Sequence, residues 1–233
     1  DFENLSKNFT NVEFVVNDGY LKINPRQVTL TSASDSKAYD GKPLTNSTVI
    51  ASTGENNGFV GTDGVVCNVT GTQTEVGDSD NEFTYSAKGN TNLSNYQITS
   101  VFGKLTVSAT AAEVFVTITE NSKTVKYNGS EQSVTGYEVT HISNSLYTKN
   151  DFTFSGNAEA KGTDAGTYKM GLKDTDFHNE NSSFTNVKFV IVPGALTIKK
   201  RNVTLTSASA SRLYNGEALT NSTVTVTGDG FAE

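Results

Sequence analysis

The chain of 233 residues has one cysteine, Cys67, and no tryptophan. A single cysteine cannot form an internal disulfide, so side-chain packing has to hold each core together. Extracellular animal proteins made of many short strands usually contain disulfides. The scarcity of cysteine, together with abundant Thr, Asn and Gly, therefore favours a bacterial surface protein. The lack of tryptophan removes one of the large flat side chains that bind sugar rings.

The chain also has few charges and no long apolar run. Charged residues make up 18% of the sequence, and the formal net charge is −7. This negative balance repels phosphate backbones, so we expect no nucleic-acid partner. No apolar stretch approaches the roughly 20 residues that span a bilayer, and no basic amphipathic stretch indicates a lipid surface. We therefore expect no direct membrane insertion.

The residue patterns of common active sites are missing as well. The two histidines, His141 and His178, lack the neighbouring Cys or carboxylate spacing of a zinc site. Cys67 lies in an apolar run, Val65–Val69, and is expected to be a small core residue rather than a nucleophile. The sequence contains no Gly-x-Ser-x-Gly and no phosphate-binding loop. These absences predict a protein that is not an enzyme and has no cofactor.

The sequence does contain a long internal repeat. Residues 1–52 recur at residues 176–227, and 29 of the 52 positions are identical. Self-similarity at a fixed period is typical of tandem arrays. Catalytic residues seldom need copies along one chain, whereas multivalent display and reach do. The repeat therefore favours a binding array or a spacer.

A shorter period of about 88 residues lies within the long one. A Tyr-Asp/Asn-Gly triplet occurs three times, as Tyr39-Asp40-Gly41, Tyr127-Asn128-Gly129 and Tyr214-Asn215-Gly216. A length near 90 residues suits one small all-β domain with its own core. Two alternating subtypes of module are therefore expected.

The predicted modules divide the chain into four segments. We expect the C-terminal strands of a truncated repeat at 1–25, a subtype-one module at 26–108, a subtype-two module at 109–200, and the start of another subtype-one repeat at 201–233. A lone run of about 33 residues such as 201–233 cannot bury enough surface to fold by itself. The phase of the modules is left open for this reason.

Alternating apolar and polar residues predict strands throughout the chain. The alternation is that of half-buried strands rich in Val, Ile, Thr and Phe. It covers 12–16, 20–24, 28–31, 96–101, 104–108, 114–119, 187–191 and 224–227. Asn17-Asp18-Gly19, Phe102-Gly103 and Pro193-Gly194 are predicted to turn tight hairpins, with Gly194 in the left-handed region.

The expected fold is all-β, with tandem small β-sandwich (Ig-like) modules arranged end to end. The alternative is a β-grasp-like module, which would need an amphipathic helix of about ten residues. The best helical stretch, 109–113, is too short and leads directly into a strand. Short junctions such as 24–27, with Pro25 fixing one φ angle, predict a semi-rigid array.

Two motifs carry weak hints of a site. Asp78, Asp80 and Glu82 have the alternating oxygen spacing of a calcium loop, although the glycine and the distant glutamate of such a loop are missing. The simpler interpretation is a solvated acidic hairpin, so we predict no metal site apart from this weak candidate. The Tyr-Asp/Asn-Gly triplets are expected to be turns with a packing tyrosine, and the alternative is a repeated ligand edge.

The order of the motifs resembles a known family. Each complete module closes with Gly-x-Leu-Thr-Ile/Val, and the triplet, Gly166-Thr167-Tyr168 and Asn95-Tyr96 add to the pattern. Together they resemble the MBG/YDG-type repeats of bacterial cell-surface, adhesin-like proteins. The subtype-one module departs from the pattern, with Val76-Gly77-Asp78 in place of Gly-Thr-Tyr. The resemblance implies tandem modules in secreted or wall-attached proteins and supplies no catalytic residues.

Three functions fit these observations. The first is cell adhesion by weak multivalent binding to a host glycoprotein, mucin or carbohydrate. The second is a passive semi-rigid stalk that presents a distal binding domain. The third, an accessory domain of a secreted enzyme, lacks any visible catalytic constellation. The expected location is extracellular, at the bacterial cell surface or cell wall, and neighbouring repeats of the same chain are expected contacts.

Overall fold

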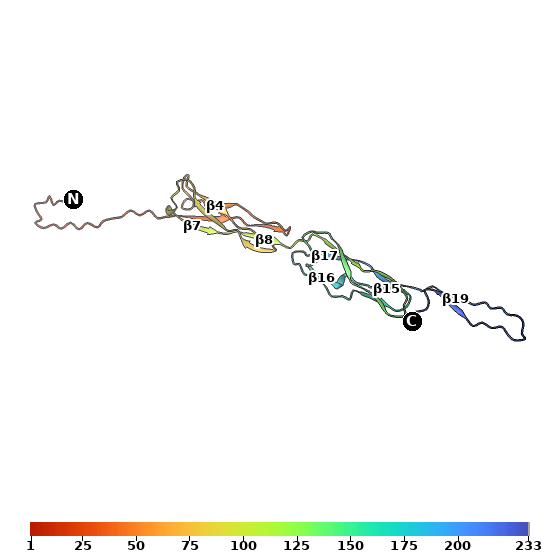
Figure 1. The fold of residues 1–233 in the computed structure, drawn as a ribbon. Helices are drawn as coiled ribbons and strands as arrows, with labels where there is room; N and C mark the ends of the chain where they lie inside the picture. Colours follow the sequence, from red (N-terminus) through yellow and green to blue (C-terminus); the bar gives the residue numbers. More distant parts are fainter. Residues whose placement is uncertain (233) are drawn as a thin grey trace. The chain divides into compact units, whose positions relative to one another are not determined.

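The computed structural model describes residues 1–232, which form two compact units (Figure 1). The first unit comprises Asp1–Asp35, Thr45–Thr72 and Ser79–Leu105. The second comprises Ser36–Leu44, Gln73–Asp78 and the residues from Thr106 onward. The module boundaries inferred from the repeats remain a prediction.

The chain is all-β, as predicted, and its small sheets fit β-sandwich-type modules. The first eight strands are β1 (Arg26–Ser32), β2 (Asp35–Ala38), β3 (Val49–Ala51), β4 (Val65–Val69), β5 (Gly77–Asp80), β6 (Phe83–Ala87), β7 (Tyr96–Val101) and β8 (Lys104–Ser108). The next ten are β9 (Val114–Glu120), β10 (Lys123–Lys126), β11 (Gln132–Thr135), β12 (Tyr137–Ile142), β13 (Phe152–Phe154), β14 (Glu159–Gly162), β15 (Gly166–Lys169), β16 (Phe177–Asn179), β17 (Val187–Val192) and β18 (Ala195–Lys199). The last two are β19 (Val203–Ser207) and β20 (Val224–Gly228).

Helical structure is limited to two short 3-10 segments in residues 1–232, η1 (Leu93–Asn95) and η2 (Asp174–Asp176). A β-grasp module is therefore not supported, because its amphipathic helix has no counterpart in the described part of the chain. The same residues contain no helix long and apolar enough to cross a membrane.

The first unit is organised around β1. This strand pairs antiparallel with β3 and parallel with β7, while β4 pairs with β6 in a second sheet. Strand β8 lies between β2 and β5 in a further sheet, and most residues of these three strands belong to the second unit. Alternation along β1 places Val28 and Leu30 in a core with Phe83 and Tyr96. Half-buried Cys67 packs against this core, as its apolar strand predicted.

The second unit repeats this plan with more aromatic residues. Strand β9 lies between β12 and β17, and it runs parallel to β17. Strand β18 lies between β10 and β15, while β11 pairs with β14 and β13 with β16. The larger of the two core clusters is in this unit. Figure 1 labels three of the unit's strands, β15, β16 and β17. Val114, Val116 and Ile118 of β9 point into this core and are fully buried.

The predicted hairpins at Phe102-Gly103 and Pro193-Gly194 are wrong. The strands were predicted correctly, but β7 pairs with β1 whereas β8 pairs with β2 and β5. In the same way β17 pairs with β9, whereas β18 pairs with β10 and β15. The two-residue connections therefore carry the chain from one sheet to another. Neither glycine has a positive φ, so the predicted left-handed position of Gly194 is wrong too.

These two glycines are required by a close backbone approach. A Cβ on Gly194 would lie 2.5 Å from the carbonyl oxygens of Glu120 and Asn121, and one on Gly103 would lie 2.5 Å from those of Ser32 and Ala33. Real Cβ atoms do not approach backbone so closely. The closing Gly-x-Leu motif is therefore a packing motif at the end of the first long strand.

A buried side chain secures each of these contacts. The Glu120 carboxylate, 4% exposed, accepts hydrogen bonds from the amides of Gly194 and Leu172, each 2.6 Å long. At the corresponding place, the Ser32 hydroxyl accepts from the Gly103 amide at 3.0 Å and donates to the Asn81 carbonyl at 2.6 Å. Both contacts satisfy backbone amides that would otherwise be buried without a partner.

Residues 1–25 differ from their prediction, because the structure assigns no strand to them. The strands expected at 12–16 and 20–24 and their hairpin are therefore absent from this segment. In the copy at 176–200, β17 needs β9 and β18 needs β10 and β15. Within residues 1–232, no strand pairs with residues 1–25, and an isolated pair of strands is not stable by itself.

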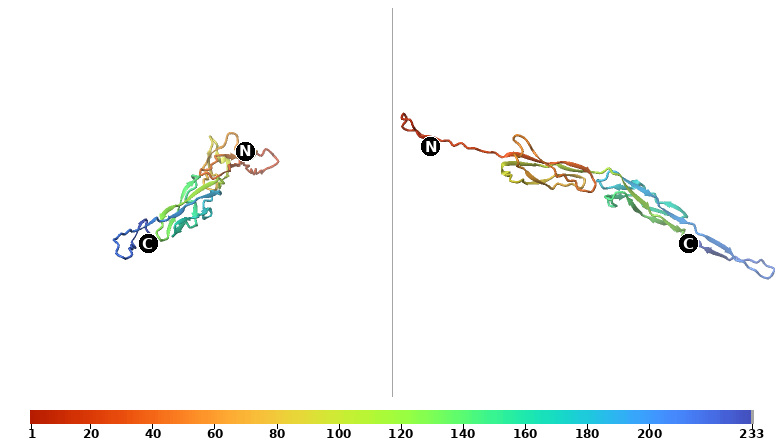
Figure 2. Two further views of the ribbon diagram at one scale, coloured as in Figure 1. Left: turned by 90° about the vertical axis from the view of Figure 1, so that its right-hand side faces the viewer. Right: turned by 90° about the horizontal axis from the view of Figure 1, so that it is seen from above.

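Residues 201–232 form a β-hairpin of β19 and β20, drawn in blue in Figure 2. Leu205 pairs with Val226, which reproduces the Leu30–Ala51 register of β1 and β3. The counterpart of β7 is absent from the described residues beyond β20. Leu205 is consequently 58% exposed, whereas Leu30 is 1% exposed.

Replacing Gly194 by alanine tests the close approach. Gly194→Ala should lower the free energy of unfolding of the second unit by about 1–3 kcal/mol, because the added methyl group forces β18 away from Glu120. Gly19→Ala is the matched control, since Gly19 occupies the same place in the unpaired copy and its Cβ would meet nothing within 4 Å. Equal stabilities of the two variants in chemical denaturation would contradict this role.

Candidate functional site

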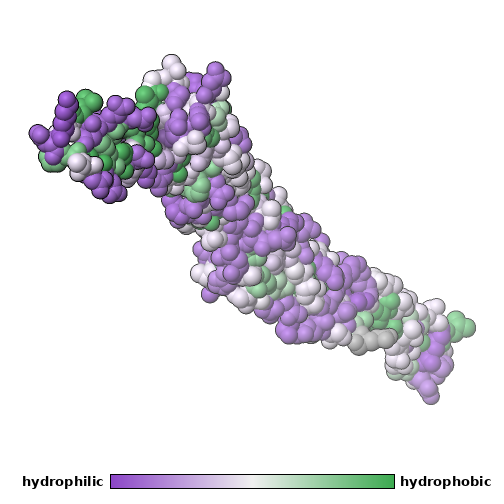
Figure 3. Space-filling view, turned by 90° about the vertical axis from the view of Figure 1, so that its left-hand side faces the viewer, coloured by the Kyte–Doolittle hydropathy of each residue, from purple (hydrophilic) through white to green (hydrophobic). Residues whose placement is uncertain are grey.

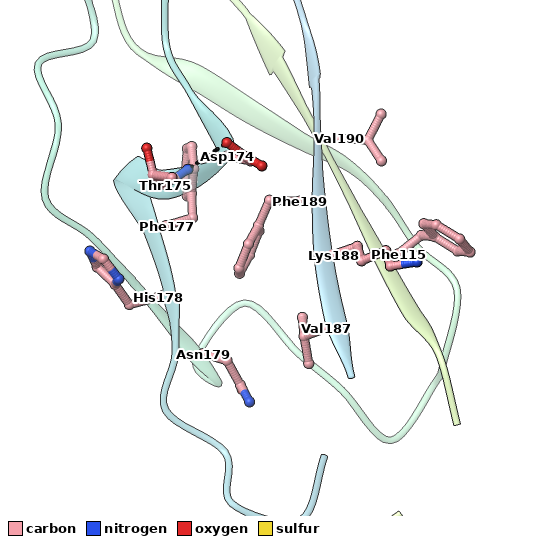
Figure 4. Close-up of a pocket in the computed structure, with 10 residues that line it drawn as sticks. All are labelled: Phe115, Asp174, Thr175, Phe177, His178, Asn179, Val187, Lys188, Phe189 and Val190. Atoms are coloured by element: carbon pink, nitrogen blue, oxygen red, sulfur yellow. Dashed lines mark hydrogen bonds between the residues drawn. The ribbon is translucent and has the colours of Figure 1, made fainter. Parts of the chain in front are cut away.

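An open groove of the second unit lies between strands β16 and β17 (Figure 4). Its volume is about 640 Å³. The lining residues are Phe115, Asp174, Thr175, Phe177, His178, Asn179, Val187, Lys188, Phe189 and Val190. They come from three segments of the chain: β9, the consecutive η2 and β16, and β17.

The groove exists because two neighbouring strands belong to different sheets. Strand β16 pairs only with β13, and β17 is the edge of the β12-β9-β17 sheet. An edge strand has backbone N–H and C=O groups along one side that no neighbouring strand uses. The gap between β16 and β17 therefore has a polar backbone rim.

Aromatic side chains form the floor of the groove. Phe177 is 4% exposed and stacks on half-buried Phe189, with ring centroids 5.4 Å apart. In Figure 4 the Phe189 ring points into the space between the two strands, whereas Phe115 and Lys188 project from the other side of β17. Phe115 is aligned with Lys188 in the β9–β17 pairing, and the Lys188 ammonium lies 5.8 Å from the Phe115 ring centroid.

Polar groups stand around this floor. Lys188 also forms an ion pair with Glu113, and the Asp174 carboxylate accepts from the Thr175 amide at 2.9 Å. His178 Nε2 lies 3.0 Å from the Ser155 hydroxyl. Apolar rings beside a few hydrogen-bonding and charged groups are typical of small-ligand sites.

The Ser155–His178 contact does not form a catalytic triad. Both side chains are exposed, and no hydrogen bond within residues 1–232 orients the second ring nitrogen of His178. A triad needs that third group to fix the imidazole. The Ser155–His178 pair therefore lacks the third member of such a triad among the described residues. His141, the other histidine, is also exposed and lies on β12.

The acidic candidate residues are not gathered into one site. Asp78, on strand β5, accepts from the Thr106 hydroxyl at 2.6 Å, and Asp80 pairs with Lys104 at 3.1 Å. The expected acidic hairpin is absent, since β5 and β6 belong to different sheets. No group of three metal-binding side chains occurs within residues 1–232. The prediction of no metal site, with Asp78, Asp80 and Glu82 as the one weak calcium candidate, stays a prediction.

The Tyr-Asp/Asn-Gly triplets are turns, as predicted. Gly41, Gly129 and Gly216 all have positive φ, between 71° and 86°. The Tyr39 ring meets Phe184 edge to face, with centroids 5.7 Å apart. Gly41 lies so close to Leu146 that an added Cβ would be 2.8 Å from it. The first triplet therefore packs on residues of the subtype-two repeat inside the second unit.

A hydrogen-bonded loop supports the aromatic residues that Tyr39 contacts. The Tyr147 ring packs edge to face on Phe184, and burial, followed by the charges of Asp151 and Glu180, raises the pKa of Tyr147 to about 12. Burial acts to raise the pKa of Asp151 as well. Hydrogen bonds from the Thr148 hydroxyl and amide and from Asn181 outweigh it, and the pKa of Asp151 lies below its ordinary value.

Sequence reasoning missed the groove. The sequence pattern predicts ordinary core positions for Phe177 and Phe189. Alternation of apolar and polar residues does not show that β16 and β17 lie side by side without hydrogen-bonding to each other. Phe115 did carry a signal, since it stands on the outward side of β9 between buried Val114 and Val116. An exposed aromatic residue beside a lysine is a common feature of binding surfaces.

The structure thus defines a small all-β module with an open aromatic groove. Comparison with protein families finds that residues 114–200 match the MBG domain. The resemblance inferred from the motifs is confirmed for these residues, which include the whole groove. No curated protein and no solved structure matched the chain.

The Tyr39 contact can be tested with a matched pair of variants. Tyr39→Ala should lower the unfolding free energy of the second unit by about 1 kcal/mol, because an edge-to-face aromatic pair is lost. Tyr214→Ala removes the equivalent tyrosine of the third triplet, which is 95% exposed, and should change nothing. Thermal unfolding of the two variants at one protein concentration makes the comparison. A Tyr39→Ala variant as stable as Tyr214→Ala would show that the contact contributes no stability.

Asp151→Asn should destabilise the second unit at pH 7 by about 1 kcal/mol, because charge-assisted hydrogen bonds are lost. The pKa of Asp151 is lower in the folded state than its ordinary value of 3.8. The stabilisation is therefore complete above pH 3.8 and disappears as the pH falls through the folded-state pKa. Denaturant titrations between pH 7 and pH 2 should show the variant and the parent converging at low pH. A constant difference across that range would contradict the role of the carboxylate.

Proposed function

We propose that the chain is a non-catalytic repeat region of a bacterial surface protein and acts in cell adhesion. The observation that carries this proposal is the aromatic groove of residues 114–200, in a module that matches the MBG domain. We infer that the groove binds a host glycoprotein, mucin or carbohydrate. Its Phe rings pack on apolar faces of the ligand, and Lys188, His178 and Asn179 offer hydrogen bonds.

Binding by one module is expected to be weak. The groove is open, and its polar groups stand at the rim rather than in an enclosed pocket (Figure 4). Repetition compensates for this weakness, because linked sites raise the effective concentration of the second binding event. The near-copy repeats of the sequence support such an array.

A passive stalk is the second candidate, and it rests on a different observation. Tyr39, Gly41 and their triplet pack on Phe184 and Leu146 of the following repeat. This contact joins part of the predicted subtype-one module to residues of the predicted subtype-two module inside one unit, which supports a spacer. Both functions can coexist in one chain.

The proposal is tested by a glycan and mucin binding screen of the chain, as a monomer and in a clustered form. Binding on clustering should fall at least tenfold in Phe115→Ala and Lys188→Glu, because both change the groove rim at exposed positions. Lys161→Ala is the control, since this exposed lysine lies on β14 outside the groove.

The same screen separates the alternatives. Absence of binding in both the monomeric and the clustered form would contradict the adhesion proposal and favour the stalk. Binding that survives both groove variants would place the ligand elsewhere on the chain. Loss of binding with a chelator would implicate Asp78, Asp80 and Glu82 in a calcium-dependent contact.

A further inference from the structure

A second open groove of the second unit lies between strands β12 and β13. Its volume is about 520 Å³, and its lining residues are Tyr137, Glu138, Val139, Lys149, Phe152 and Phe154. Both strands are sheet edges, because β12 ends the β12-β9-β17 sheet and β13 pairs only with β16. This β12–β13 groove shares no lining residue with the groove between β16 and β17.

Three half-buried aromatic rings form a wall of the β12–β13 groove. Tyr137, Phe152 and Phe154 each contact the buried Phe177 ring, with centroids between 4.9 and 6.0 Å apart. Polar residues cover much of the face drawn in Figure 3, with smaller apolar areas between them. The rings therefore offer a ligand an apolar contact that is fixed in place by the core.

Three polar groups at this groove have no partner in the described chain. Within residues 1–232, no hydrogen bond or ion pair engages the Tyr137 hydroxyl, the Glu138 carboxylate or the Lys149 ammonium group. The hydroxyls of buried Tyr96 and Tyr147, in contrast, both donate hydrogen bonds within the protein. Burial raises the pKa of Tyr137, so its hydroxyl keeps its proton at neutral pH and donates to a ligand.

A hydrogen-bonded turn positions Lys149 beside the rings. The Asp151 carboxylate accepts from the Thr148 amide at 2.6 Å and from the Asn181 side chain at 2.8 Å. The Asp151 amide donates to the Thr148 carbonyl at 3.2 Å, which closes the turn around Lys149. Binding groups whose backbone is held before the ligand arrives lose less conformational freedom on binding.

The first unit has the corresponding strands without these polar groups. Ser32 of β1 pairs with Val49 of β3, whereas Glu120 at the corresponding place in β9 pairs with Tyr137 of β12. By the same register, Ile50 stands where the second unit has Glu138. The fold of the module therefore does not require a hydroxyl and a carboxylate at these places.

We propose that the β12–β13 groove is a second binding site and that it takes an uncharged sugar ring, a hexopyranoside. A carboxylate is only an acceptor and an ammonium group only a donor, while a sugar hydroxyl both donates and accepts. One ligand type thus satisfies Glu138, Lys149 and the Tyr137 hydroxyl together. The apolar face of the sugar ring packs on the aromatic wall.

Charge and length favour this occupant over others. One carboxylate and one ammonium group leave the groove without net charge, so neither an acidic nor a basic ligand gains from it. Only Tyr137–Val139 of β12 lines the groove, a length of about 7 Å between the first and third Cα atoms. An extended peptide usually adds a strand of about 5–6 residues and needs a longer edge.

The site is tested by titrating the full chain with the methyl glycosides of glucose, galactose and mannose while its amide resonances are followed by NMR. We expect millimolar binding of at least one glycoside, with shifts at residues 137–139 and 149–154. Tyr137→Phe keeps the ring and should weaken binding about two- to tenfold. Glu138→Gln should weaken it about tenfold, because a charged acceptor is lost.

Tyr85→Phe is the matched control. The Tyr85 hydroxyl, on β6, also has no hydrogen-bond partner within residues 1–232, and it lies outside the groove. This variant should bind the glycoside as the parent does. Tyr137→Phe should unfold at the same temperature as the parent, since it removes no hydrogen bond of the protein.

Phe115→Ala and Lys188→Glu separate this site from the groove of the adhesion proposal. Both alter the groove between β16 and β17 and should leave glycoside binding unchanged. Failure of one site is therefore distinguishable from failure of the other.

Three outcomes would overturn the proposal. The first is the absence of shifts with all three glycosides. The second is binding that is lost in Phe115→Ala or Lys188→Glu and persists in Tyr137→Phe and Glu138→Gln, which would place the sugar in the other groove. The third is tighter binding of the acidic sugar sialyllactose than of any neutral glycoside, which would contradict the uncharged ligand.

Discussion

The structure depends on the pairing of the first long strand of each repeat with a strand about 70 residues later in the chain. Strand β1 requires β7, and β9 requires β17, in parallel register. The close approach of Gly103 to Ser32 and of Gly194 to Glu120 fixes where the chain changes sheets. Parallel strands need a long connection between them. A shorter piece of the repeat therefore lacks the strand that would hydrogen-bond to its first long strand.

This constraint explains why similar sequences have two different structures in one chain. Leu196 is buried because β9, β10 and β15 surround it, and Leu21 is exposed because no strand of the described residues pairs with its segment. The β19–β20 hairpin is an intermediate case, since the antiparallel partner is local and the parallel partner is absent from the described residues. Local sequence sets the strand propensity, and a distant partner decides whether the strand forms.

The candidate site follows from the same arrangement. Because the chain changes sheets at Gly194 and not earlier, β17 stays at the edge of its sheet and β16 pairs only with β13. Phe177 and Phe189 form the floor of the gap between these strands, and both also belong to the aromatic core. The groove is therefore a consequence of the sandwich topology, and its floor is as rigid as the core beneath it.

The sequence by itself determined the all-β class, the positions of most strands, the turns of the Tyr-Asp/Asn-Gly triplets and the MBG-type resemblance. These features rest on alternation and on glycine φ angles, which are local properties. Tertiary structure alone decided that Phe102-Gly103 and Pro193-Gly194 are crossings between sheets, that residues 1–25 lack strands, and that a groove opens between β16 and β17. Each of these depends on which distant strand supplies the hydrogen bonds, and a period of two residues does not contain that information.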